Sequence, residues 1–129
     1  FCGLQHAKMA VTVVAHAPAD FEAWLDEQAR PAAEPTSARA KEGLEVLRAT
    51  DCARCHTVRG TEADGRRGPD LTHLASRRDI AGGALRLDAE SLTRWLADPH
   101  EVKEGTSMPD PELSDDEVES LVAYLEGLR

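Results

Sequence analysis

The chain has 129 residues, of which 41% are hydrophobic and 30% charged, and its formal net charge is −9 at pH 7. This length suits one ordinary domain, or a small domain with an appendage, and excludes a large enzyme. The surplus of carboxylates argues against a nucleic-acid partner, because phosphates are met by clustered Lys and Arg, and it favours cationic protein partners. The longest uncharged apolar run, residues 9–19, is too short to span a bilayer. We therefore expect a soluble chain, with any membrane anchor or export signal upstream of Phe1.

The first nine residues, FCGLQHAKM, bring three soft metal ligands close together in the sequence. They are Cys2, His6 and Met9. Taken alone, the pattern has an accidental explanation, since a free Cys or Met is commonly just a buried apolar residue. A thiolate, an imidazole and a thioether together nevertheless suit copper.

Residues 9–16 alternate two faces rich in β-branched side chains, and this pattern predicts a strand. Residues 18–30 then predict a helix, with Pro18 in its first turn and Phe21, Trp24 and Leu25 on one side. Those apolar side chains would pack against a sheet that this short chain does not contain.

Residues 31–37, PAAEPTS, have the composition of a flexible linker and indicate a domain boundary. We therefore divide the chain into residues 1–30, a linker at 31–37, and a second domain at 38–129. In that domain, residues 38–49 predict a helix with Leu44 and Leu47 facing inward. Gly43 would allow another helix to approach closely.

The rest of the second domain also reads as helical. A short helix is expected at residues 70–76, and a firmer one at 89–97 is capped by Asp88 and ends before Pro99. Ser114 and Glu117 form a capping box for the last helix. That helix carries an apolar stripe made of Val118, Leu121, Val122, Leu125 and Leu128.

The segment CARCH, which holds Cys52, Cys55 and His56, is the strongest chemical signal in the chain. Two thiols separated by two residues can add across the vinyl groups of one haem, and the following His is then the proximal iron ligand. A thiol redox pair or a zinc site is the alternative. A structural zinc site, however, needs a second pair of ligands, and none stands at a suitable spacing.

A six-coordinate iron needs one further ligand, and the candidates are Met108, His73 and His100. Met108 is favoured because it lies in GTSMPDP, where glycine and prolines make a stiff loop and no apolar stripe is available for a buried Met to join. Each of the two histidines is more typical of a surface or hydrogen-bonding residue.

Four features together resemble a class I cytochrome c across residues 38–129: CARCH, GPDL at 68–71, TSMP, and a terminal amphipathic helix containing Tyr124. The resemblance implies a mainly α fold around a covalent haem c, with His56 and Met108 as the iron ligands. It also implies that the carbonyl of Pro69 accepts a hydrogen bond from His56. In this family the first and last helices cross, which would bring Gly43 and Leu47 near Tyr124 and Leu121.

The start of the chain, FCGLQHAKM followed by a strand and PADFEAWL, resembles the end of the copper domain in subunit II of haem-copper cytochrome c oxidases. The resemblance implies a truncated strand and helix remnant of a cupredoxin-like domain. Cys2 would match the second bridging thiolate of the dinuclear CuA centre, and His6 and Met9 its terminal ligands. The first Cys, an acidic residue and an upstream His are missing, so we expect the copper site to be incomplete.

The order copper domain, linker and cytochrome c domain is found in subunit II of caa-type bacterial oxidases. The resemblance therefore implies an electron relay that takes electrons from a donor and passes them through the CuA centre to a separate catalytic subunit. We expect no catalytic site on this chain, an anchor upstream, and a place on the periplasmic or outer face of the membrane. The alternatives are a free-standing soluble cytochrome c, a haem sensor or peroxidase-like domain, and a zinc-binding interaction module.

Overall fold

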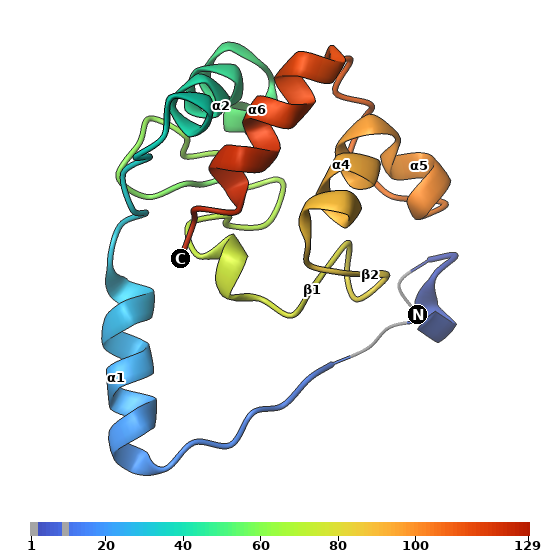
Figure 1. The fold of residues 1–129 in the computed structure, drawn as a ribbon. Coiled ribbons are helices and arrows are strands. Elements are labelled where there is room, and N and C mark those ends of the chain that lie inside the picture. The colour runs from blue at the N-terminus through green and yellow to red at the C-terminus, as the bar shows by residue number, and fades with distance from the viewer. Residues whose placement is uncertain (1–2, 9–10) are drawn as a thin grey trace.

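The computed structural model describes residues 3–8 and 11–129, and the fold is mainly helical, as expected (Figure 1). The elements in chain order are η1 (His6–Lys8), α1 (Pro18–Ala29), α2 (Ala38–Ala49), α3 (Cys52–Cys55), η2 (Leu74–Ser76), β1 (Asp79–Ile80), β2 (Leu85–Arg86), α4 (Ala89–Ala97), α5 (Pro99–Val102) and α6 (Asp115–Leu125).

Helices α2 and α6 pack side by side and form the centre of the core (Figure 1). The contact is close because Gly43 has no side chain: a Cβ atom built there would lie 2.0 Å from the carbonyl oxygen of Ser120 and 2.8 Å from the Cβ of Tyr124. Leu47 and Leu121 are both almost fully buried in the same cluster. The predicted approach of the first and last helices of this domain is confirmed.

Side-chain caps fix where the core helices begin. The hydroxyl of Ser114 accepts a hydrogen bond from the Glu117 N–H, and the Glu117 carboxylate accepts one from the Ser114 N–H, so the predicted capping box is present. Asp88 caps α4 by accepting from the Ser91 N–H. All five residues of the predicted apolar stripe are buried, four of them on α6 and the fifth, Leu128, just after its end.

Three elements differ from the sequence-based expectation. The helix expected at residues 70–76 is only the 3₁₀ turn η2, because the Asp70 carboxylate accepts a hydrogen bond from the Thr72 N–H and forms a turn at that point. The antiparallel pair β1–β2, with Ile80 opposite Leu85, was not predicted. The one-turn helix α5 was also missed.

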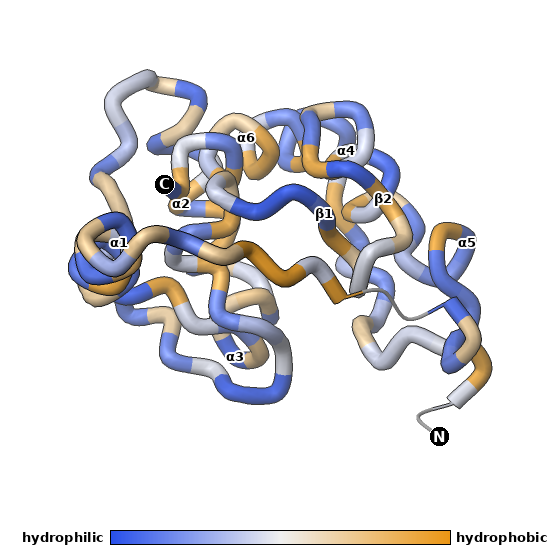
Figure 2. Tube along the Cα trace, turned by 90° about the horizontal axis from the view of Figure 1, so that it is seen from below, coloured by the Kyte–Doolittle hydropathy of each residue, from blue (hydrophilic) through white to orange (hydrophobic). Residues whose placement is uncertain are grey.

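The predicted strand at residues 9–16 is wrong for the part that is described. Residues 11–17 have no regular structure, and Val11 and Val13 are 83% and 86% exposed. A strand needs a neighbour for its backbone hydrogen bonds, and the two named strands of the described chain pair with each other. Figure 2 shows this apolar stretch running along the outside of the molecule into α1.

Helix α1 forms as predicted but buries no residue, and Phe21, Trp24 and Leu25 are all exposed. It projects away from the α2–α6 core (Figure 1). The turn η1 lies near residues 104–105, where the Gln5 side-chain amide donates to the Glu104 carbonyl at 3.4 Å. Among the described residues, no helix is long and apolar enough to cross a membrane.

Candidate functional site

Cys52 and Cys55 lie on the single turn α3, three residues apart and therefore on the same face. The His56 N–H closes this turn by donating to the Cys52 carbonyl at 2.9 Å. Both cysteines are half-buried and neither is in a disulfide. The turn thus presents two thiols together, with His56 directly after them, as attachment of one haem through two thioether bonds requires.

The imidazole of His56 is held in one orientation from two sides. Its Nδ1 lies 2.8 Å from the carbonyl oxygen of Pro69, and because a carbonyl only accepts, Nδ1 carries the proton. A Cβ atom on Gly68 would lie 2.4 Å from Cε1 of this ring, so the backbone passes directly against it. Nε2 is then the lone-pair nitrogen, which is the tautomer needed to bind a metal through Nε2.

The loop at residues 57–71 is tied back onto the Cys52–His56 segment by backbone hydrogen bonds. The Gly68 N–H donates to the Cys55 carbonyl at 2.7 Å, and the Leu71 N–H donates to the Thr57 carbonyl at 2.8 Å. The Thr57 hydroxyl also donates to the Gly65 carbonyl at 2.8 Å. These bonds keep Pro69 in place opposite His56.

Half-buried apolar side chains from several elements lie at the edge of the core. They are Leu71, Leu85, Leu87, Trp95, Met108 and Leu113, and all of them pack against the core cluster. Partly exposed apolar side chains of this kind suit a flat apolar cofactor, which would cover what they leave exposed. The two thiols, the oriented imidazole and these apolar side chains together fit a covalent haem c.

The three candidates for the second axial ligand have different surroundings. Met108 lies in the irregular segment between α5 and α6, and its side chain is half-buried against the core. His73 is buried, with its Nε2 3.1 Å from the Arg30 carbonyl oxygen. His100 lies on α5 and is exposed. Met108 is therefore the candidate whose side chain is half-buried against apolar residues.

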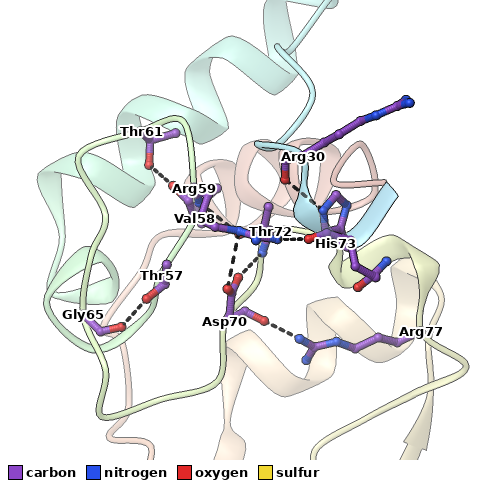
Figure 3. A network of polar contacts seen from close by, with 11 residues as sticks. Arg30, Thr57, Val58, Arg59, Thr61, Gly65, Asp70, Thr72, His73 and Arg77 are labelled. Carbon is purple, nitrogen blue, oxygen red and sulfur yellow. Dashed lines mark hydrogen bonds and ion pairs between the residues drawn. The ribbon is translucent and has the colours of Figure 1, made fainter. Parts of the chain in front are cut away.

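A polar network next to this site was not anticipated from the sequence (Figure 3). The Arg59 N–H donates to the Thr72 hydroxyl at 2.9 Å, and the Thr72 N–H donates to the Asp70 carboxylate at 2.8 Å. Burial alone would raise the pKa of Asp70, but the hydrogen bonds from Thr72 and the charges of Arg59 and Arg77 together lower it. The Asp-x-Thr spacing at 70–72 signals the turn, whereas nothing in the sequence signals the part played by Arg59.

Only one of the three expected copper ligands lies within the described residues. His6 is exposed on η1, while Cys2 and Met9 lie outside the described residues. Within residues 3–8 and 11–129, no cluster of three or more His, Cys, Asp or Glu side chains is placed to hold a metal ion.

Three curated relatives match 99% of this chain, and each is called cytochrome c oxidase subunit 2. The identity is 35% for the protein of Alkalihalophilus pseudofirmus strain OF4, 32% for that of Bacillus subtilis strain 168 and 33% for that of Bacillus sp. strain PS3. The chain spans 37% of the length of these relatives. A solved structure, the c-type cytochrome SorU from Sinorhizobium meliloti, is 28% identical with a TM-score of 0.49, covering 70% of this chain and 90% of SorU.

The cytochrome c family profile matches residues 40–129. This span includes the paired thiols of Cys52 and Cys55, the oriented ring of His56 and the α2–α6 core. With the motif, its geometry and the profile in agreement over most of the sequence, the chain belongs to the cytochrome c family, whose domain binds haem c covalently and transfers electrons.

Proposed function

We propose that this chain is the haem-bearing part of a subunit 2 of a terminal oxidase, which receives electrons from a donor protein and passes them to a copper centre for oxygen reduction by a separate catalytic subunit. Matches over 99% of this chain to three relatives named cytochrome c oxidase subunit 2 support the oxidase assignment. A net charge of −9 favours a donor with a basic docking surface.

The observation that best supports the electron-transfer role is the hydrogen bond between His56 and the Pro69 carbonyl. Cys52 and Cys55 would hold haem c covalently, and when bound this group supplies a one-electron ferric–ferrous couple. The Pro69 carbonyl, 2.8 Å from Nδ1, fixes the ring and raises the basicity of Nε2, the nitrogen that would face the iron. Gly68 permits this arrangement because any side chain there would displace the ring.

Met108 is the proposed second axial ligand. A thioether ligand favours the ferrous state and raises the reduction potential. If His56 and Met108 both held the iron, no position would remain open for oxygen or peroxide. The chain would therefore act as a relay and carry no catalytic residue of its own.

The first part of the chain would contribute to the copper centre. Cys2, His6 and Met9 are the proposed ligands from this sequence, and the resemblance to the CuA domain is what supports them. In this proposal the chain comprises a copper-domain portion at 1–30, a connection at 31–37 and the cytochrome c domain at 38–129. The complex would be anchored in the bacterial cytoplasmic membrane, with both redox centres on its outer face.

The test is oxygen consumption by the assembled oxidase carrying Cys52→Ala and Cys55→Ala together. Without the two thiols we expect no covalent haem c, and turnover with the natural donor should fall about a hundredfold. This figure is the lower end of the increase in effective affinity when two sites are joined in one molecule. A small-molecule reductant that feeds the copper centre directly should sustain turnover, which controls for assembly of the complex. Unchanged turnover with the natural donor would contradict the proposal.

A further inference from the structure

Two backbone carbonyl groups at the C-terminal end of α1 accept hydrogen bonds from side chains of the cytochrome c domain. A helix leaves its last carbonyl groups without partners inside the helix. In the last turn of α1, the Gln28 carbonyl accepts a hydrogen bond from Nη2 of Arg59 at 2.6 Å. Just after the helix, the Arg30 carbonyl accepts one from Nε2 of His73 at 3.1 Å. Figure 3 shows His73 facing the Arg30 carbonyl.

The chain after α1 continues along the same surface. The Ala32 N–H donates to the Arg59 carbonyl at 2.8 Å. Pro31 lies against Gly60, where an added Cβ atom would be 3.0 Å from the Pro31 Cβ. The first two residues of the linker are therefore bonded to, or packed against, the loop that follows the haem-binding motif.

The two donors are themselves held in place. Arg59 bonds Thr72 through its backbone N–H, and its guanidinium lies 3.8 Å from the Asp70 carboxylate. His73 is only 8% exposed, and because a carbonyl can only accept, its Nε2 carries a proton. Asp70 directly follows Pro69, the residue that orients His56.

Charge also favours this contact. The C-terminus of a helix carries a partial negative charge, which a nearby cation stabilises. Arg30 directly follows α1, and its guanidinium pairs with Glu27. Arg59 provides a second cation from the other side of the junction, and this one donates to a helix carbonyl.

Apolar packing holds α1 only weakly. No residue of α1 is buried, and an open cavity of about 370 Å³ lies between α1 and the cytochrome c domain, lined by Trp24 on one side and Arg77 on the other. The orientation of α1 thus depends on the polar contacts at its end.

We propose that Arg59 and His73 form a latch that fixes the end of α1 on the cytochrome c domain, so that α1 is a rigid extension of that domain and not the end of a free tether. Its consequence for electron transfer rests on the function proposed above: the latch would hold α1, the helix that follows the proposed copper-ligand segment, in one orientation relative to the haem-binding residues. Arg59 and His73 are positioning residues in this scheme.

The test is ¹⁵N relaxation of the haem-loaded chain in its reduced state. In the unaltered protein, α1 amides should have order parameters near those of α2 and α6, about 0.85, and in the double variant Arg59→Gln with His73→Leu they should fall below about 0.6. Cleavage by a protease at residues 31–37 should become about tenfold faster in the double variant, which corresponds to about 1.4 kcal/mol. The haem spectrum should stay the same.

Two matched variants separate the latch from a general structural role. His73→Gln keeps an N–H donor and should restore the order parameters that His73→Leu lowers. Arg77→Gln removes a cation from the same cavity, one that donates to the Asp70 carbonyl and not to α1, and should leave α1 rigid.

One variant avoids any change in the cytochrome c domain, in case the double variant fails to fold. Two glycines inserted between Ala29 and Arg30 separate the two latched carbonyls and should mobilise α1. Independent motion of α1 in the unaltered protein, or rigid α1 after this insertion, would overturn the latch. Since the order parameters do not depend on the redox partner, this failure is distinct from failure of the proposed oxidase role.

Discussion

Apolar side chains are buried in the α2–α6 pair but remain exposed in the segment from Val11 through α1. In the pair, Leu47 and Leu121 are each 1% exposed and the helix backbones meet at Gly43. In the N-terminal segment, Val13 remains 86% exposed and Trp24 44% exposed. The difference is the presence of a complementary surface: α2 and α6 provide one for each other, whereas α1 reaches the cytochrome c domain mainly through polar contacts at its end.

This comparison predicts that equal truncations will have unequal effects. Leu121→Ala removes a fully buried side chain and should lower the free energy of unfolding by about 2–5 kcal/mol. Leu25→Ala, on α1 and 40% exposed, should change it by no more than about 0.5 kcal/mol. Denaturant unfolding of the haem-loaded chain measures both. Similar losses for the two variants would mean that α1 is part of the cooperative core.

A methyl group at Gly43 should break the close approach on which the pair depends. An alanine Cβ would lie 2.0 Å from a backbone oxygen of α6, which cannot rotate away, and we expect a loss of about 1–3 kcal/mol. The sign of the change in unfolding free energy is informative, because in an exposed helix the change from Gly to Ala stabilises the protein by about 1 kcal/mol. Lys41→Ala, on the exposed face of α2, is the control and should stay within about 0.5 kcal/mol. A Gly43→Ala protein as stable as the parent would contradict the packing described.

Much of the helical domain is readable from sequence because its signals are local. The stripe on α6, the capping box of Ser114 and Glu117, and the Asp88 cap each depend on residues within a few positions of one another, and all are present. The contact of His56 with Pro69 was expected through resemblance to class I cytochromes c, and its 2.8 Å geometry agrees.

The remaining features depend on partners distant in the sequence. Residues 11–16 have the alternation of a strand, but that pattern does not say whether a neighbouring strand exists to accept its hydrogen bonds. The contact of Arg59 with the end of α1 joins residues 31 positions apart and uses a backbone carbonyl as the acceptor. A backbone acceptor leaves no side-chain pattern, so a sequence cannot reveal it.

The smallest predicted effect sharpens the contrast between capped and uncapped helix starts. The residue before α1 is Ala17, which offers no side-chain cap, whereas α6 is preceded by Ser114 of the Ser114–Glu117 box. The side-chain and backbone hydrogen bonds from Ser114 hold the pKa of Glu117 below its ordinary value of 4.5. A carboxyl whose pKa is lower in the folded state contributes stability that is complete above its unfolded pKa and is lost as pH falls through the folded value.

Stability of the parent should therefore decrease below about pH 4.5 partly through Glu117. Glu117→Gln keeps an acceptor for Ser114 but cannot titrate, so its free energy of unfolding should fall less steeply over the same range. Denaturant midpoints measured between pH 3 and pH 6 compare the two slopes. Equal slopes would mean that the charge on Glu117 adds nothing to the cap. The start of α6 would then depend on the neutral Ser114 hydrogen bond and on the apolar face buried against α2, and α1 has neither of these features.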